Sequence, residues 1–237
     1  MKCFFYFGSM QKIVVLSGAG ISAESGISTF RDNDGLWENH PIEEVATPEG
    51  WEANQNLVLQ FYNIRRKQLF EVEPNNGHKA LVRLEEKFDV QVVTQNIDDL
   101  HERAGSSNVL HLHGELKKVQ STIDPTLIYE MDSWELKHGE TCEKGSQLRP
   151  YVVWFGEDVP NIIKAVDIVK EADILIIVGT SLNVYPAAGL SYETRKEVPI
   201  FLVDPANVNT SNLKNVKHIK SGAGEGLKKL VEQLMND

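Results

Sequence analysis

Five short apolar runs recur along the chain, and they constrain its fold more than any other feature. They span 12–18, 89–95, 151–156, 173–179 and 199–204. Each is rich in β-branched residues and apolar at both odd and even positions, as parallel strands covered on two faces must be. We therefore expect the five runs to form one buried sheet.

Helical patterns alternate with several of these runs, as at 77–88 and 161–172. Strands that alternate with helices predict an α/β fold with a doubly wound parallel sheet of the Rossmann-like kind. Two longer intervals do not fit simple crossovers. Residues 32–78 contain an expected turn at TPEG and an apolar helix around 56–70, and residues 114–150 are polar and weakly periodic. We expect both intervals to be insertions packed beside the sheet.

The composition is that of a protein with one sizeable core. The chain has 237 residues, of which 41% are hydrophobic, and a net charge of −10. Nucleic acid and anionic membranes would repel it, so we expect neither as a partner, and an anionic substrate would need a local cation. Cys3 and Cys142 cannot form a disulfide framework, which fits a reducing cytosol. The opening twelve residues are too short for a secretion signal, and a cytoplasmic monomer is expected.

A glycine-rich turn, SGAGISAESG, follows the first strand run directly. Gly18 and Gly20 lie where a backbone can turn tightly and point its amides at a phosphate. A Gly-x-Gly pair is weak alone, because an ordinary strand-to-helix turn has the same form. We expect a helix to begin near Ala23, with Ser22 as its N-cap.

Polar side chains follow the second strand run in QNIDDLHERAG. Gln95, Asn96 and Asp98 would project into the crevice where open α/β sheets bind ligands. The alternative is a capped helix start, in which Asp98 only satisfies backbone amides.

Two histidines lie two residues apart in HLHGE. On an extended segment His111 and His113 face the same way, and a neutral imidazole suits a general base at physiological pH. A structural histidine is the commoner case, and the pair also fits half of a metal site.

Two later strand ends carry groups that suit a nucleotide. Gly179, Thr180 and Ser181 offer close backbone approach and two hydroxyls, and Asp204 could accept hydrogen bonds from ribose hydroxyls. A helix cap and a solvated strand end are the simpler interpretations.

The order and wording of these segments resemble the sirtuins, the NAD-dependent protein lysine deacylases. The matching segments are GAGISAESGISTFRD, TQNIDDLHERAG, HLHGEL, LRPYVVWFGE and VGTSLNVYPAAG. The resemblance runs from about residue 12 to the end and leaves out 116–147. It implies a Rossmann-like NAD-binding domain from 12–31, 79–113 and 148–237, a helical insertion at 32–78 and a small module at 114–147.

The resemblance also implies roles for individual residues. His113, which directly precedes Gly-Glu, corresponds to the family's base, and Asn96 is the second catalytic residue. The products would be free lysine, nicotinamide and 2′-O-acyl-ADP-ribose. Val152 and Phe155 would wall the acyl-lysine tunnel, and the strand VVWFGE would pair with the peptide of an acyl-lysine protein. The implied NAD site comprises Gly18, Ala19, Gly20, Phe30, Arg31, Gln95, Asn96, Asp98, Gly179, Thr180, Ser181, Asp204 and Ala223.

One departure from the family concerns zinc. Most sirtuins carry two Cys-x-x-Cys pairs between HGE and LRP, whereas this chain has only Cys142 there. One thiolate cannot hold a tetrahedral zinc, and His138 adds at most a second ligand. We predict no metal in this bacterial-type, zinc-less module. We expect it to pack around Leu127, Ile128, Trp134 and Leu136.

The stretch FYNIRR places Tyr62 and Arg65 three residues apart, on one face of a helix. A solvated Arg beside a half-buried Tyr is the ordinary interpretation. However, the resemblance extends to the sirtuin subgroup that removes negatively charged acyl groups, which carries Tyr-x-x-Arg preceded by an Ala, here Ala46. A guanidinium and a phenol could pair with the carboxylate of succinyl-lysine or malonyl-lysine. We therefore predict desuccinylase and demalonylase activity besides deacetylation.

Other functions fit the same motifs. An ADP-ribosyltransferase or an NAD glycohydrolase would keep the NAD site and change the acceptor, and a non-catalytic NAD-sensing module would bind without turnover. A dehydrogenase fits poorly, because QNID replaces the acidic residue that is expected after the second strand.

Overall fold

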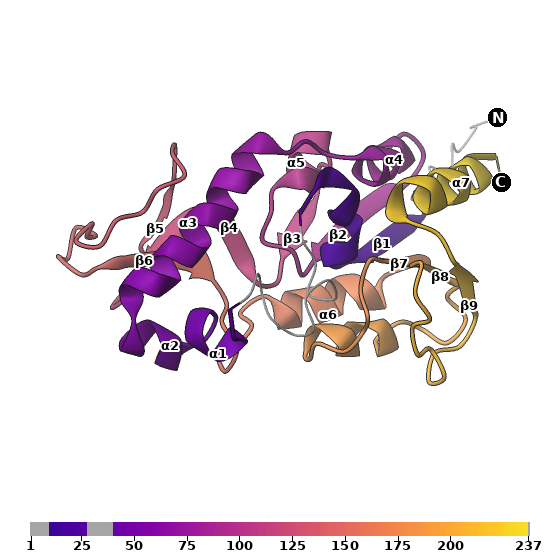
Figure 1. Ribbon diagram of the computed structural model, residues 1–237. Coiled ribbons are helices and arrows are strands. Elements are labelled where there is room, and N and C mark those ends of the chain that lie inside the picture. Colours follow the sequence, from indigo (N-terminus) through magenta and orange to yellow (C-terminus); the bar gives the residue numbers. More distant parts are fainter. Residues whose placement is uncertain (1–9, 28–39, 237) are drawn as a thin grey trace, which may run out of the picture.

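A six-stranded parallel sheet forms the centre of the main body in the computed structural model, which describes residues 10–27 and 40–236 (Figure 1). The strand order is β3-β2-β1-β7-β8-β9, and every neighbouring pair is parallel. The predicted doubly wound α/β fold is therefore confirmed. The strands are Lys12–Ser17 (β1), Asp89–Thr94 (β2), Val109–His111 (β3), Ile174–Val178 (β7), Ile200–Val203 (β8) and Val216–Ile219 (β9).

The winding direction of the sheet reverses between β1 and β7. Ser17, the last residue of β1, pairs with Thr94 of β2 on one side and with Val178 of β7 on the other. The carboxyl ends of these three strands therefore lie side by side. In open α/β sheets such a reversal opens a crevice for ligands.

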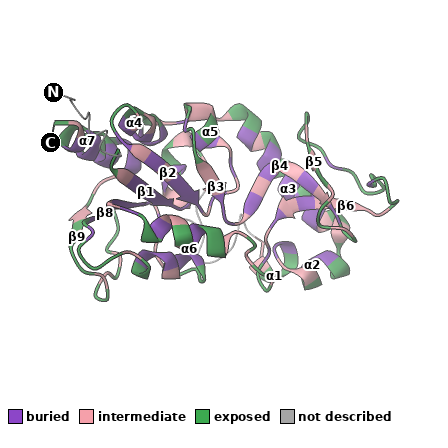
Figure 2. Ribbon diagram, turned by 180° about the vertical axis from the view of Figure 1, so that it is seen from behind, coloured by how far each residue is buried: buried purple, intermediate pink, exposed green. Residues whose placement is uncertain are grey.

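Helices cover both faces of this sheet (Figures 1 and 2). Helices α4 (Asn76–Leu84) and α7 (Ala223–Asn236) pack on the face that carries Ile13 and Val15. Helix α6 (Ile162–Lys170) and the 3-10 segment Ala187–Tyr192 pack on the face that carries Val14 and Leu16. Successive strand residues point to opposite faces, so burial on both sides explains why the strands are apolar at every position.

A smaller unit lies beside the main body and combines the two inserted intervals. Helices α1 (Ile42–Val45), α2 (Pro48–Ala53) and α3 (Gln55–Glu71) pack with a three-stranded antiparallel sheet of order β5-β4-β6. Its strands are Gly114–Ser121 (β4), Ile128–Glu130 (β5) and Leu148–Val152 (β6). They share a second core that includes Trp51, Tyr62, Leu116, Leu136 and Trp154.

One predicted strand is wrongly placed. The run 151–156 does not join the main sheet: β6 ends at Val152 and pairs antiparallel with β4. Val152 and Trp154 are buried in the second core instead, and a short apolar run cannot show which core it enters. The sequence reasoning also missed β3 and β9, which have three and four residues with half-polar sequences.

One local prediction at a helix start is wrong, and another is only partly right. TPEG is no turn, because Thr47 accepts a hydrogen bond from the Gly50 amide at 3.0 Å and caps α2, which begins at Pro48. Pro is well tolerated at a first helical position. The helix expected near Ala23 is only a short 3-10 segment, Ala23–Ser25; Ser22 occupies its N-cap position, but the Ser22 side chain makes no cap bond.

The predicted packing of the small module is partly wrong. Leu136 is buried and Leu127 half-buried, but Ile128 is 39% exposed and Trp134 is 38% exposed. In the short edge strand β5 the middle residue, Tyr129, packs against the core. Because side chains alternate along a strand, Ile128 points to solvent.

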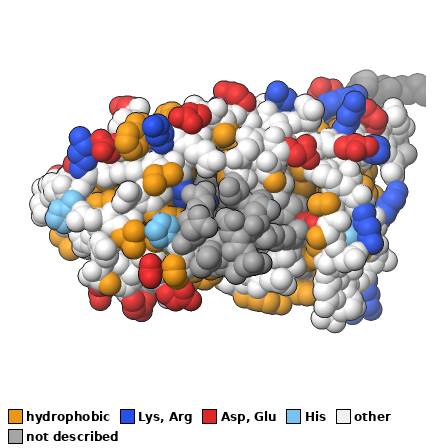
Figure 3. Space-filling view, viewed as in Figure 1, with side chains coloured by type: hydrophobic (Ala, Val, Ile, Leu, Met, Phe, Trp, Pro, Cys, Tyr) orange, Lys and Arg blue, Asp and Glu red, His pale blue; other side chains and the backbone are white. Residues whose placement is uncertain are grey.

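Lysines and arginines are mixed with acidic side chains on the face in Figure 3. Within residues 10–27 and 40–236, no helix is long and apolar enough to cross a membrane.

Candidate active site

The glycine loops after β1 and β7 are bonded to each other at the sheet's reversal point. The Gly18 amide donates to the Val178 carbonyl at 3.0 Å, and the Gly20 amide donates to the Gly179 carbonyl at 2.8 Å. A Cβ at Gly20 would lie 2.6 Å from the Gly179 Cα. The close approach predicted from the sequence is present, but both amides serve the contact between loops rather than pointing at an anion.

A buried polar cluster lies beside these loops. Ser22 donates its hydroxyl to Asp98 Oδ2 at 3.0 Å and accepts a hydrogen bond from Asn96 Nδ2 at 3.1 Å. The tight 3-10 turn directs Ser22 inward, so the residue expected to cap a helix instead orients two site residues. Asp98 Oδ1 also accepts the Leu100 amide at 3.2 Å, but the N-cap residue of helix Leu100–Ala104 is Asp99. Asp98 therefore serves one backbone amide besides Ser22, which is more than the alternative interpretation allows.

Burial raises the pKa of Asp98 to about 6, although its hydrogen bonds from Leu100 and Ser22 act in the opposite direction. Removing a carboxylate from water disfavours its charged form. At neutral pH Asp98 is therefore an ionised but poorly hydrated acceptor, and a ligand that donates hydrogen bonds would stabilise it.

The ends of β2 and β7 are joined by side chains. Gln95 Nε2 donates to Thr180 Oγ1 at 3.2 Å, across the crevice between the two strand ends. Ser181 is half-buried next to Thr180. The structure thus brings the predicted groups of 95–98 and 179–181 together.

His111 and His113 differ in their hydrogen bonds. His111 uses Nδ1 with the Asn96 carbonyl at 2.9 Å and Nε2 with Glu102 Oε1 at 2.8 Å. His113 Nδ1 lies 3.0 Å from the Gln95 carbonyl. A carbonyl can only accept, so Nδ1 of His113 carries the proton and Nε2 of its neutral ring holds a lone pair.

The pKa values of these two histidines move in opposite directions. Burial lowers the pKa of His113, with the Gln95 carbonyl opposing it. Burial also acts to lower the pKa of His111, but the Glu102 carboxylate outweighs it and raises that pKa. His113 is therefore the neutral, basic imidazole, and His111 is held by its carboxylate partner.

Buried hydroxyl groups form a hydrogen-bonded chain next to the Asn96 backbone, which the sequence did not predict. Ser17 donates to Thr94 Oγ1 at 2.8 Å and lies 2.9 Å from His101 Nε2. Thr94 Oγ1 also accepts the Asn96 amide at 3.0 Å. The one sequence feature that could have indicated these contacts was the position of His101 within the same QNIDDLHERAG segment.

Four predicted NAD residues remain, of which the structure describes Asp204 and Ala223. Asp204 is buried at the end of β8 and accepts the Ala206 amide at 2.9 Å, so it is no solvated strand end. Ala223 is buried at the start of α7. Phe30 and Arg31 lie outside the described residues.

Tyr62 and Arg65 are buried together in the second core, on α3. Trp154 Nε1 donates to the Tyr62 hydroxyl at 3.0 Å, and the Arg65 guanidinium lies 5.1 Å from the Phe61 ring centroid. Arg65 is only 7% exposed, so the interpretation as a solvated Arg is wrong. Burial raises the pKa of Tyr62, while the Trp154 bond and the charge of Arg65 oppose it.

The comparisons with known proteins agree with this geometry. The model of the Sir2 family matches residues 18–186. The chain belongs to the Sir2 family. Its curated relatives include NAD-dependent protein deacylases from Bacteroides thetaiotaomicron, 53% identical over 95% of this chain and 99% of the relative, and Helicobacter pylori, 54% identical over 95% and 98%. A solved Sir2 homologue in complex with NAD is 38% identical, covers 96% of this chain and 90% of its own, and superposes with a TM-score of 0.87.

The other predicted substrate residues of this Sir2 chain differ in their burial. Ala46 and Val152 are buried in the same core, whereas Phe155 is 43% exposed. The segment after β6 ties them together, because the Val153 amide donates to the His113 carbonyl and the Phe155 amide to the Ala46 carbonyl, each at 2.9 Å. These two amides are used inside the protein, and the pairing of 151–156 with a peptide through its other backbone groups stays a prediction.

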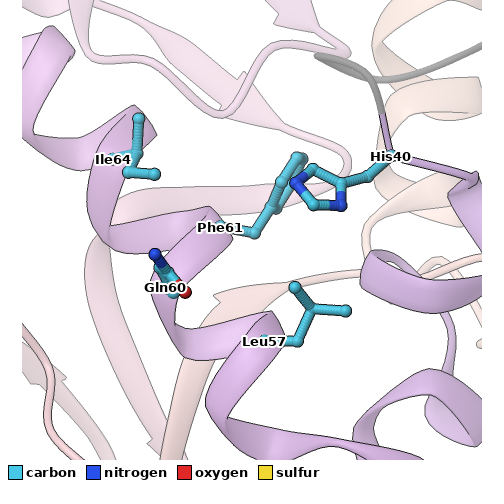
Figure 4. A pocket seen from close by; sticks show the side chains of 5 residues that line it. All are labelled: His40, Leu57, Gln60, Phe61 and Ile64. Atoms are coloured by element: carbon cyan, nitrogen blue, oxygen red, sulfur yellow. The ribbon is translucent and has the colours of Figure 1, made fainter.

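Two hollows flank this region of the Sir2 chain. One has a volume of about 140 Å³ and lies on the outer face of α3, where Figure 4 shows His40 next to Phe61 and the side chains of Leu57, Gln60 and Ile64 along the helix. The other, of about 190 Å³, lies beside β6 and is bordered by residues of 112–114, 151–153 and 157–161.

Cys142 is not part of a metal cluster. Its Sγ lies 3.4 Å from Ser121 Oγ and 3.3 Å from Ser146 Oγ. Within the described part of the chain, no group of three or more His, Cys, Asp or Glu residues is placed to hold a metal ion.

Proposed function

We propose that this Sir2-family NAD-dependent protein deacylase removes acidic acyl groups, succinyl and malonyl, as well as acetyl, from lysine side chains. The products are free lysine, nicotinamide and 2′-O-acyl-ADP-ribose. The observation that carries the proposal is that Tyr62 and Arg65, three residues apart on α3, are both buried. A guanidinium and a phenol on one helix face can together bind a carboxylate through charge-assisted hydrogen bonds.

The acidic acyl chain enters between Ala46, Val152 and Tyr62, which belong to one core cluster. Small Ala46 leaves room that a larger side chain would fill. Arg65 supplies the positive charge, which a protein with a net charge of −10 needs locally to attract an anionic substrate.

NAD fits the crevice between β1, β2 and β7. The glycines let the two loops pack closely, so we expect backbone rather than side chains to face the ligand. Ala19 lies between Gly18 and Gly20, and its backbone amide is expected to contact the diphosphate. When bound, NAD supplies the ADP-ribosyl group that accepts the acyl group as nicotinamide leaves. The described residues proposed to hold it are Gly18, Ala19, Gly20, Gln95, Asn96, Asp98, Gly179, Thr180, Ser181, Asp204 and Ala223.

Each residue of the polar cluster at the crevice has a proposed role. Asp98 accepts hydrogen bonds from the nicotinamide carboxamide, and Asn96 orients the adjacent ribose, both held by Ser22. His113 removes a ribose hydroxyl proton with its Nε2, since Nδ1 already donates to the Gln95 carbonyl. Asn96 and His113 are therefore the proposed catalytic pair.

The protein substrate lies beside the segment that follows β6. The hollow bordered by 112–114, 151–153 and 157–161 adjoins that segment. Because the amides of Val153 and Phe155 are used internally, we expect the peptide to pair with other backbone groups of the segment 151–156.

An acyl-peptide panel tests the proposal. Wild type, Arg65→Met and the control Lys67→Met are assayed on one peptide carrying succinyl-, malonyl- or acetyl-lysine, with and without NAD. Lys67 is an exposed cation on the same helix, so its loss matches the charge change without touching the core. Arg65→Met should lose about 2 to 5 kcal/mol of transition-state stabilisation on the acidic substrates and far less on acetyl-lysine.

Three outcomes would contradict the proposal. Equal losses on all acyl groups would make Arg65 structural. Absence of succinyl and malonyl turnover by the wild type would remove the acidic-acyl assignment. Rapid nicotinamide release without any acyl-peptide would favour an NAD glycohydrolase instead.

A further inference from the structure

We infer that Trp154 is a positioning residue for acidic acyl groups, because its indole N–H fixes the Tyr62 hydroxyl so that the phenol donates its hydrogen to the acyl carboxylate. This inference rests on the proposed function, since it requires a carboxylate next to Tyr62. It adds a specificity determinant outside the Tyr-x-x-Arg pair.

The direction of one hydrogen bond carries the inference. Trp154 Nε1 lies 3.0 Å from the Tyr62 oxygen, and both side chains are buried. An indole nitrogen can only donate, so the phenol must be the acceptor and its own hydrogen must point away from the indole. The phenol oxygen is thereby oriented before any ligand arrives.

The acid–base state of Tyr62 agrees with a donor role. Burial raises the pKa of Tyr62, so the group stays a neutral phenol at physiological pH. A neutral phenol can donate to a carboxylate, whereas a phenolate would repel it. Arg65, whose charge acts on Tyr62, supplies the second, charged contact.

The indole is itself held firmly from outside the core. The Arg149 guanidinium lies 3.5 Å from the Trp154 ring centroid and pairs with both carboxylate oxygens of Glu157, at 2.7 and 3.0 Å. Glu157 Oε2 also accepts the Trp154 amide at 2.7 Å. One carboxylate thus fixes both the backbone of Trp154 and the cation that covers its ring.

Trp154→Phe separates the hydrogen bond from the packing. Phenylalanine keeps an aromatic ring in the core but has no N–H to donate. We expect the succinyl-to-acetyl ratio of kcat/KM to fall about three- to tenfold, the range for losing one neutral hydrogen bond. The loss should lie in the KM for the succinyl peptide rather than in kcat.

Trp51→Phe is the matched control. Trp51 is a second buried tryptophan whose ring centroid lies 5.7 Å from that of Trp154. The same chemical change there should alter thermal stability without changing the acyl ratio. A fall of the ratio in both variants would mean that core packing, not the indole N–H, sets the preference.

A double-mutant cycle with Tyr62→Phe provides the second test. If Trp154 acts through the Tyr62 hydroxyl, Trp154→Phe should change the acyl ratio no further once that hydroxyl is gone. Independent, additive effects would overturn the inference. If Trp154→Phe does not fold, Arg149→Lys is tested in its place. Lysine cannot make the two-point contact with Glu157, so this variant should also lower the succinyl-to-acetyl ratio. An unchanged ratio in Arg149→Lys would overturn the inference.

The two levels of the proposal can fail separately. Wild type without succinyl turnover removes the proposed function and this inference with it. Suppose instead that Arg65→Met loses succinyl turnover while Trp154→Phe keeps the wild-type ratio of succinyl to acetyl activity. That result would remove only the role of Trp154.

Discussion

His113 Nδ1 lies 3.0 Å from the Gln95 carbonyl oxygen, and this contact distinguishes His113 from its neighbour two residues earlier. It fixes the proton on Nδ1 and leaves Nε2 as a lone pair, whereas both ring nitrogens of His111 are engaged by Asn96 and Glu102. A base needs a free lone pair, so the hydrogen bonds favour His113 over His111.

We expect His113→Ala to reduce deacylation by about 10²- to 10⁴-fold while NAD binding is largely kept, because the imidazole moves a proton rather than holding the dinucleotide. Turnover and NAD titration on the same preparation measure this. Since only the neutral ring is a base and burial lowers the pKa of His113, wild-type activity should persist below pH 6.5 before it falls. Near wild-type turnover in the variant would leave His111 as the next candidate.

The Asp98 carboxylate makes a prediction about stability. Burial raises the pKa of Asp98 to about 6 from its ordinary value of 3.8. The folded protein therefore holds this proton more tightly than the unfolded chain, so the stability that Asp98 contributes is present at low pH and is lost as pH rises through about 4 to 6. At neutral pH the buried Asp98 charge lowers the free energy of unfolding by about 3 kcal/mol at most, relative to low pH.

Asp98→Asn should therefore raise the melting temperature of the free protein at pH 7.5 and weaken NAD-dependent activity, because the amide removes the buried charge together with a carboxylate acceptor. Thermal unfolding at pH 4 and at pH 7.5 checks the sign, since the variant's advantage should vanish at the lower pH. A variant less stable than wild type at pH 7.5 would show that the charge is well compensated in the fold.

How far the sequence predicts the structure depends on whether the signal is local. The main-sheet strands were read correctly where both faces are buried, as in β1 and β7, because that pattern is continuous in sequence. The run 151–156 was assigned to the wrong sheet because its burial depends on α3, which lies far away in the chain. Long-range packing leaves no signature in a run of six residues.

The candidate site shows the same division. The grouping of Gln95, Asn96 and Asp98 followed from their place after a strand, but the role of Ser22 did not, because it depends on a 3-10 turn that resembles a helix start in sequence. The bond between Trp154 and Tyr62 joins residues 92 positions apart and was invisible for that reason.

The small module should be stable without metal. Arg66, fully buried on α3, donates to the carbonyls of Leu116 and Trp134 at 2.6 and 2.8 Å, and Asn63 exchanges two hydrogen bonds with the Leu136 backbone at 2.9 Å each. These contacts hold the module to the helix. We expect metal analysis of the purified protein to find no stoichiometric zinc and a strong chelator to leave the melting temperature unchanged. One zinc per chain would point to a site that uses His138 or His111.

A pair of buried histidines predicts how the protein responds to acid. His78 on α4 and His101 on α5 (Leu100–Ala104) are fully buried, with ring centroids 5.0 Å apart. Burial lowers the pKa of His78 to about 4 and that of His101 to about 3. Both rings are neutral when folded, while the unfolded chain takes up protons below pH 6.5, so the stability they contribute is present above pH 6.5 and is lost on acidification.

His78→Leu should reduce this acid sensitivity. Neither ring nitrogen of His78 has a hydrogen-bond partner among the described residues, so a leucine of similar size removes a protonation site without removing a bond. Between pH 7.5 and pH 5 the wild type should lose about 2 kcal/mol of unfolding free energy through His78, from the pKa difference and 1.4 kcal/mol per pH unit. Denaturant titration at the two pH values measures the difference, with His138→Leu, at an exposed histidine, as the control. If His78→Leu loses as much stability on acidification as wild type and the control do, the buried pair does not set the acid limit of the fold.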